Sequence, residues 1–137
     1  MHLKEALKAR ERAYVPYSQF KVGAAIRLKD GTFVLGANIE NSSYGLTCCA
    51  ERNALFSLIS QGYNKDDIES ITVTGDTKGP ISPCGACRQV MKELVPKDAK
   101  IFLTNLKGDV HETKVDELLP FGFDLNDDKS VWQKVHL

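Results

Sequence analysis

The spacing of hydrophobic positions changes several times along this chain, and each change predicts a new element. Near the N-terminus, apolar side chains recur three and four residues apart among charged ones, which predicts an amphipathic helix over residues 2–14. From Phe20 to Leu28 apolar and other residues alternate, as they do in a strand with one buried face. Asp30-Gly31 then predicts a hairpin turn, and residues 32–39 form the returning strand.

Helical periodicity returns twice more, and three short β-rich runs complete the pattern. The helices are expected over residues 49–61 and 84–94, and the strands over residues 68–74, 101–104 and 110–115. This order predicts a three-layer α/β fold, with a five-stranded mixed sheet and helices on both faces. The last two strands are expected to be antiparallel, because the link between them is too short for a parallel crossover.

Length and charge narrow the classes of protein to which the chain can belong. Its 137 residues suit a single domain, 1–137, with a core over residues 20–115 and a tail over residues 124–137. Lys plus Arg and Asp plus Glu both number 18, so the formal net charge is 0. Nucleic-acid binders usually carry a basic excess, so we expect no nucleic-acid partner and a small or neutral ligand instead. Zero net charge also makes self-association easier.

Nothing in the sequence predicts a membrane partner. No apolar run reaches the roughly 18 residues that a bilayer span requires, and the charged N-terminal stretch lacks the apolar region of a secretory signal. We therefore expect a cytoplasmic protein whose four cysteines stay reduced.

Three of those cysteines form the most informative pattern in the chain. Cys84 and Cys87 are three residues apart at the start of one expected helix, and Cys49 opens the helix before it. A helix N-terminus favours the thiolate that a metal requires. Three thiolates could bind one Zn²⁺ and leave its fourth position open to water, as in catalytic zinc sites. Glu51 would then supply a general acid and base, provided that the site lies over the helix end.

Other interpretations of the cysteines stay open at this point. A C-x-x-C pair also occurs in redox proteins, but here no aromatic residue precedes Cys84 and no proline separates the pair. Cys48 would allow a closed structural site of four cysteines. Two adjacent cysteines do not easily bind one tetrahedral metal, however, so we expect Cys48 in the core. A non-catalytic zinc-stabilised binding module is a third interpretation, and Glu51 beside an open metal position argues against it.

Several blocks of sequence resemble one known family. C-A-E at 49–51 and P-C-G-A-C-R-Q at 83–89 are similar to the motifs of zinc-dependent nucleoside deaminases. F-K-V-G-A-A at 20–25, G-A-N-I-E-N at 36–41 and E-L-L-P at 117–120 resemble the short, homotetrameric type of the cytidine and deoxycytidylate deaminase family. The resemblance implies hydrolysis of cytidine and 2′-deoxycytidine to uridine and 2′-deoxyuridine with release of ammonia, in pyrimidine salvage.

The resemblance also assigns roles to individual residues. It implies that Cys49, Cys84 and Cys87 bind one zinc ion per subunit and that Glu51 carries protons. The expected substrate-binding residues are Phe20, Asn38, Glu40, Ala50, Ser82 and Phe123. Among these, Asn38 and Glu40 would bind the ribose 3′-hydroxyl, a backbone carbonyl near Ser82 would hold the amino group, and Phe123 would enter a neighbouring subunit's pocket. The residues alone leave alternatives open. Asn38 and Glu40 could simply face solvent at a strand end, and Phe20 and Phe123 could pack in the core.

Two further points follow from the ligand set. Three thiolates on one Zn²⁺ leave a net negative charge, which weakens the metal as a Lewis acid. Arg52, three residues after Cys49, is therefore expected to donate to the thiolates, with Arg88 as a weaker candidate. The alternative functions are a blasticidin-type nucleoside deaminase or a nucleic-acid editor. Editors carry a histidine in the first motif, where this chain has Cys49.

Overall fold

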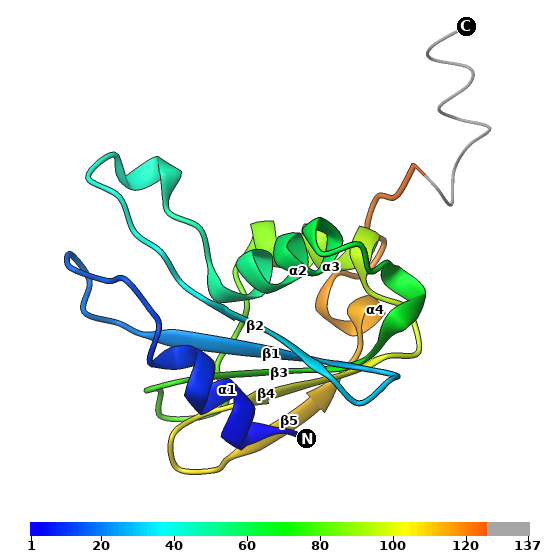
Figure 1. Ribbon diagram of the computed structural model, residues 1–137, viewed down its shortest axis with the longest axis horizontal. Coiled ribbons are helices and arrows are strands. Elements are labelled where there is room, and N and C mark those ends of the chain that lie inside the picture. The colour runs from blue at the N-terminus through cyan, green and yellow to red at the C-terminus, as the bar shows by residue number, and fades with distance from the viewer. Residues whose placement is uncertain (126–137) are drawn as a thin grey trace, which may run out of the picture.

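The helices and strands of the computed structural model stack in three layers (Figure 1). The structure describes residues 1–125. The strands are Val22–Leu28 (β1), Phe33–Ala37 (β2), Ile68–Gly75 (β3), Lys100–Thr104 (β4) and Val110–Thr113 (β5). The α-helices are Leu3–Arg10 (α1), Ala50–Ser60 (α2), Gly85–Leu94 (α3) and Val115–Leu118 (α4), and 3-10 turns lie at Tyr44–Leu46 (η1) and Lys65–Asp67 (η2).

The five strands form one mixed sheet in the order β2-β1-β3-β4-β5. Strands β3 and β4 are parallel, and the other neighbouring pairs are antiparallel, including β4 with β5. Helix α1 packs on one face, and α2, α3 and α4 lie over the other (Figure 1). The predicted three-layer fold, the helices on both faces and the antiparallel last pair are therefore confirmed.

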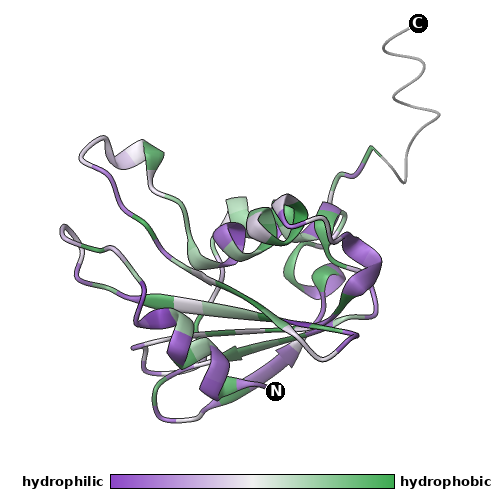
Figure 2. Ribbon diagram, viewed as in Figure 1, coloured by the Kyte–Doolittle hydropathy of each residue, from purple (hydrophilic) through white to green (hydrophobic). Residues whose placement is uncertain are grey.

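Burial differs strongly between the middle and the edge of the sheet. Every residue of β1 except Arg27 is buried, because helices cover both faces of this strand. In β5 only Thr113 is buried, and Figure 2 shows this strand as largely hydrophilic. The alternation seen in the β1 sequence therefore marks a strand, but not one with a solvent-facing side.

Several element boundaries differ from the predicted ones. The N-terminal helix ends at Arg10, not at residue 14, because the N–H groups of Arg12 and Ala13 turn back to carbonyls three residues earlier. Tyr14 then bonds to the backbone on either side of Ile39. Strand β2 ends at Ala37, two residues early, and the last strand ends at Thr113, where α4 follows. Most of the tail expected over 124–137 lies outside the described residues.

Two glycines let helices approach the sheet closely. A Cβ at Gly23 would lie 2.1 Å from the carbonyl oxygen of Ala6 in α1. A Cβ at Gly36 would lie 2.5 Å from the carbonyl oxygen of Ala50 and 2.4 Å from the backbone nitrogen of Ala54, both in α2. Only glycine leaves room for these backbones. Because α2 begins at the cysteine cluster, Gly36 helps to set the position of that cluster over the sheet.

A buried asparagine fixes the loop between β3 and α3. The Asn105 side chain donates to the carbonyls of Thr77 and Lys78 and to the Asp109 carboxylate, and it accepts from the N–H groups of Lys107 and Asp109. The same loop is bound to β4 through the Ile81 N–H and the Thr104 carbonyl, 3.0 Å apart. These contacts hold in place a loop that lines the cavity described next.

Candidate active site

A cavity of about 380 Å³ opens where β1 begins and where β2 and β3 end. This volume is within the range of small-molecule sites. Its walls come from the segment before β1, the segments after β2 and β3, and the first residues of α2 and α3. The lining residues are Ser18, Phe20, Val22, Asn38, Glu40, Tyr44, Thr47, Cys49, Ala50, Glu51, Thr77, Ile81, Ser82 and Cys84.

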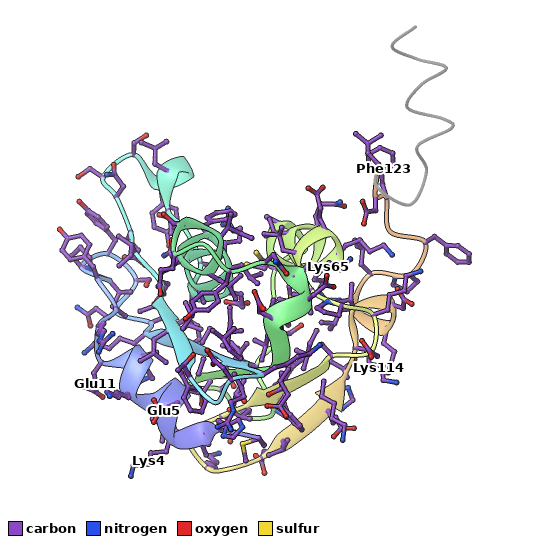
Figure 3. All side chains as sticks on the ribbon, turned by 45° about the vertical axis from the view of Figure 1, so that its right-hand side comes forward. Lys4, Glu5, Glu11, Lys65, Lys114 and Phe123 are labelled. Carbon is purple, nitrogen blue, oxygen red and sulfur yellow. The ribbon has the colours of Figure 1, made fainter. Side chains whose placement is uncertain are left out.

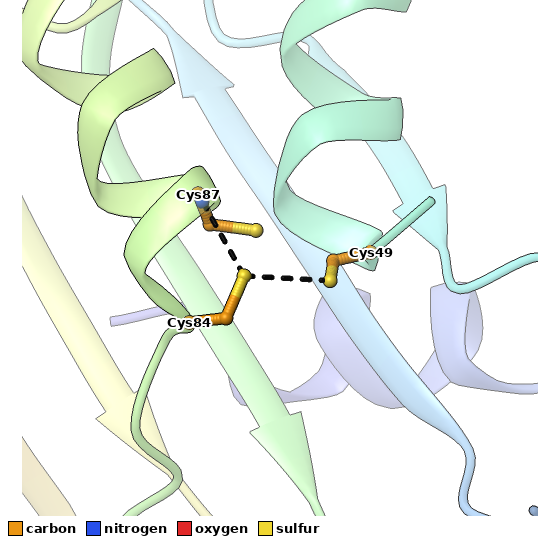
Figure 4. A group of neighbouring side chains, drawn as sticks. All are labelled: Cys49, Cys84 and Cys87. Atoms are coloured by element: carbon orange, nitrogen blue, oxygen red, sulfur yellow. Dashed lines mark hydrogen bonds between the residues drawn. The ribbon is translucent and has the colours of Figure 1, made fainter. Parts of the chain in front are cut away.

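Three cysteine sulfurs converge at one end of this cavity (Figure 4). Cys49 and Cys84 are the N-cap residues of α2 and α3, and Cys87 lies in the first turn of α3. The Sγ atoms of the three residues all lie within 4.8 Å of one another, and those of Cys49 and Cys84 are 3.7 Å apart. Three soft donors at two helix N-termini are a donor set that suits Zn²⁺.

The cluster stabilises negative charge on sulfur. A hydrogen bond from the Cys87 thiol, with a second one from Arg52, holds the pKa of Cys49 well below its ordinary value. The same hydrogen bond raises the pKa of Cys87. The Nη2 atom of Arg52 lies 3.5 Å from the Cys49 sulfur, and its Nε atom is buried without a hydrogen-bond partner among the described residues.

Arg88, the weaker candidate for the same contact, points elsewhere. Its guanidinium donates to the carbonyls of Pro83 and Leu118 and to the Ser82 hydroxyl. It therefore braces the segment before Cys84 against α4, and within the described part of the chain it makes no hydrogen bond to a cysteine sulfur.

The carboxylate of Glu51 is buried beside the sulfurs. Glu51 is 5% exposed and lines the cavity from the first turn of α2. Burial raises the pKa of this carboxyl to about 7. A carboxyl with a pKa near neutrality can both accept and release a proton, as a general acid and base must. The condition set by the sequence, that the site lies over the helix end, is met.

Asn38 and Glu40 both line the cavity, but their polar atoms already have partners. Asn38 donates to the Phe20 carbonyl at 2.8 Å and accepts from the Val22 N–H at 2.9 Å. Glu40, 4% exposed, accepts from the N–H groups of Tyr17 and Ser18 and from the Ser18 hydroxyl. That hydroxyl lowers the pKa of Glu40, so the side chain is held as a carboxylate.

With this geometry in view, comparison with known proteins identifies the family. Residues 1–103 match the family model described as the cytidine and deoxycytidylate deaminase zinc-binding region. This chain belongs to the cytidine and deoxycytidylate deaminase family.

Individual members are similar over most of the length of this deaminase. It is 59% identical to a cytidine deaminase of Halalkalibacterium halodurans over 93% of this chain and 97% of the relative. It is 52% identical to one from Sporosarcina psychrophila over 91% and 90% of the two chains. The solved cytidine deaminase of Burkholderia pseudomallei superposes with a TM-score of 0.85 at 53% identity, covering 88% of this chain and 94% of that one.

The remaining predicted residues of this deaminase lie in different surroundings. Phe20, Ala50 and Ser82 line the cavity. Phe123 does not: it is 58% exposed, near the end of the described chain (Figure 3), and its carbonyl accepts from the side chain of Gln89. Phe121, the other candidate in that segment, is fully exposed.

Sequence reasoning missed part of the cavity wall. Thr47, Thr77 and Ile81 line it from loops whose path no periodicity predicts. Ser18 was also missed, although its hydroxyl contacts Glu40. The one available signal was that Ser18 lies two residues before Phe20 in the sequence.

Proposed function

We propose that this chain hydrolyses cytidine and 2′-deoxycytidine to uridine and 2′-deoxyuridine and releases ammonia. The observation that carries the proposal is the buried carboxylate of Glu51 beside three convergent cysteine sulfurs, at the end of a cavity of about 380 Å³. Family membership supports it, because the similar proteins described above bear the name cytidine deaminase.

The donor set fits one zinc ion per subunit. Cys49, Cys84 and Cys87 would hold the metal, since their sulfurs already lie within 4.8 Å of one another and two helix N-termini favour the thiolate form. A zinc ion bound there would act as a Lewis acid and lower the pKa of a water molecule, which supplies the nucleophile.

Glu51 would then move the protons of the reaction. It takes one proton from the attacking water and passes it to the ring nitrogen N3, which makes C4 electrophilic. The hydroxide left from that water adds to C4. Glu51 then takes the proton of the new C4 hydroxyl and delivers it to the amino group, so that the C4–N bond breaks, ammonia leaves and C4 keeps a carbonyl oxygen. The sum is one nucleoside and one water in, one deaminated nucleoside and one ammonia out. The raised pKa of Glu51 supports this role in both directions.

The other end of the cavity would hold the sugar. In this proposal Asn38 and Glu40 bind the ribose 3′-hydroxyl, with the amide as donor and the carboxylate as acceptor. Phe20 and Ala50 flank the nucleoside, and a carbonyl at Ser82 accepts from the amino group. What supports these roles is that all five residues line the one cavity.

Arg52 would offset the charge of the three thiolates. Its guanidinium lies 3.5 Å from the Cys49 sulfur, and a donor to sulfur withdraws electron density from the metal ligand. The net negative charge of the loaded site would fall, and the metal would act as a stronger Lewis acid.

Self-association as a homotetramer is also part of the proposal, with Phe123 completing a neighbour's pocket. It is supported by the number of large apolar side chains left exposed, which mark interaction surfaces. These include Tyr44, Leu46, Phe56, Phe121 and Phe123.

The proposal extends to location and domain organisation. A site of reduced thiols is best maintained in the cytoplasm, and the four cysteines are free. Among the described residues no helix is both long enough and apolar enough to cross a bilayer. One sheet and one cluster of buried apolar residues support treating residues 1–137 as one domain.

A substrate panel tests this function. The zinc-loaded protein is incubated with cytidine, 2′-deoxycytidine and blasticidin S, and the loss of absorbance and the release of ammonia are followed. We expect turnover of the two cytosine nucleosides. A zinc-loaded protein that turns over only blasticidin S would favour the alternative deaminase, and one that turns over nothing would favour a binding module.

A further inference from the structure

The loop before β1 is folded around one carboxylate. Both oxygens of Glu40 are bound by this loop: Oε1 accepts from the N–H groups of Tyr17 at 3.0 Å and Ser18 at 3.1 Å, and Oε2 accepts from the Ser18 hydroxyl. The loop backbone is left-handed at Gln19, with φ of 57°. A residue other than glycine keeps such a conformation only where its surroundings hold it.

The Ser18 hydroxyl is the centre of this arrangement because it has two partners. Its oxygen accepts from the Phe20 N–H at 3.0 Å. Its single proton therefore goes to Glu40, which as a carboxylate can only accept. The hydroxyl thus joins two cavity-lining residues, Phe20 and Glu40, through one directed chain of hydrogen bonds.

These hydrogen bonds determine the orientation of the Glu40 carboxylate. With three donors on one side, the carboxylate cannot rotate without breaking a charge-assisted hydrogen bond. Oε2 accepts only one of these hydrogen bonds, so it keeps acceptor capacity, and Glu40 lines the cavity. A substrate hydroxyl meets an acceptor that is already oriented, so less ordering is required when it binds.

We propose that Ser18 is a positioning residue for the 3′-hydroxyl of the nucleoside and acts through Glu40. The proposal rests on the proposed function, in which Glu40 accepts from that hydroxyl. Ser18 would contribute to substrate recognition and not to the proton transfers at the other end of the cavity.

The test compares two substrates that differ only in this hydroxyl. Ser18→Ala is assayed with cytidine and with 3′-deoxycytidine under steady-state conditions. We expect KM for cytidine to rise about tenfold, as loss of one oriented hydrogen bond to a charged group would give, with kcat within a factor of two. For 3′-deoxycytidine, kcat/KM should stay at the wild-type value. Ser18→Thr keeps the hydroxyl and should restore KM.

Ser42→Ala is the matched control. Ser42 contacts the same loop, since its hydroxyl lies 2.5 Å from that of Tyr17, and among the described residues no side-chain hydrogen bond joins it to Glu40. This variant should behave as wild type with both substrates. If Ser18→Ala impairs both substrates equally, or neither, the proposal is wrong while the proposed function stands. A wild-type protein that deaminates neither nucleoside would overturn the proposed function and this proposal with it.

Discussion

Replacing Gly36 by alanine should separate the packing of α2 from the chemistry at its start. The added Cβ would lie 2.4 Å from the backbone nitrogen of Ala54, 2.5 Å from the carbonyl oxygen of Ala50 and 2.7 Å from the Ala54 Cβ. Ordinary contacts begin about 1 Å farther out. None of these atoms belongs to a flexible side chain, so the helix itself must move away from β2.

The size of the effect follows from that movement. Overpacking of a rigid core costs about 1–3 kcal/mol, and the backbone contacts place Gly36→Ala near the upper end. For a chain of this length, about 3 kcal/mol lowers Tm by roughly 10 °C. A shift of about 1 Å at Ala50 also displaces Cys49 and Glu51, and such a misplacement of reacting groups can lower the rate about a hundredfold.

Three measurements test these effects. Circular dichroism follows thermal unfolding and gives Tm, the zinc content is determined on the same sample, and the cytidine assay gives the rate. Gly79→Ala is the control, because a Cβ there meets nothing within 4 Å and no left-handed φ is required. It should leave Tm unchanged or slightly raised. If Gly36→Ala unfolds within 2 °C of wild type and keeps full activity, then the close approach does not set the position of α2, and this reasoning fails.

Three further predictions concern single side chains. Arg52→Gln should keep zinc but lose about thirtyfold in kcat, because a charge-assisted hydrogen bond to the Cys49 sulfur is worth about 2 kcal/mol; full activity in the zinc-loaded variant would exclude the role. Phe123→Ala should raise KM while Phe121→Ala leaves it unchanged, with mass measured by light scattering; a fully active monomer would remove Phe123 from the site. The pKa of Glu40 is lowered from its ordinary 4.5, so its ionised form stabilises the fold above that pH and the contribution is lost as pH falls through the lowered value. The Tm difference between wild type and Glu40→Gln should therefore be largest near neutral pH and shrink in acid, and a difference independent of pH would contradict this.

The metal-binding residues could be predicted from sequence because local rules determine their positions. Cys84 and Cys87 lie on one side of a helix start whatever the rest of the fold does, and Cys49 needs only a second helix start nearby. The fold class followed from periodicity in the same way, since the order of elements and one short link restrict the sheet to few arrangements.

The two arginines show where such rules stop. Arg52 and Arg88 follow the first cysteine of their helices by three and four residues, so spacing alone allows either to reach sulfur. Arg88 instead donates to the Leu118 carbonyl, 30 positions away. That contact depends on where α4 packs, which no local pattern reveals. The N-terminal helix ended early for a similar reason, because Tyr14 pairs with the distant residue Ile39.

The most direct test of the account is the zinc-loaded Glu51→Ala variant in the cytidine assay, with zinc measured in the same sample. Glu51 is assigned all of the proton transfers, and a general acid and base contributes on the order of 10²–10⁴-fold for a single transfer. The account predicts that zinc content stays at the wild-type level while kcat falls at least a thousandfold. A zinc-loaded variant that deaminates cytidine within tenfold of wild type would contradict it.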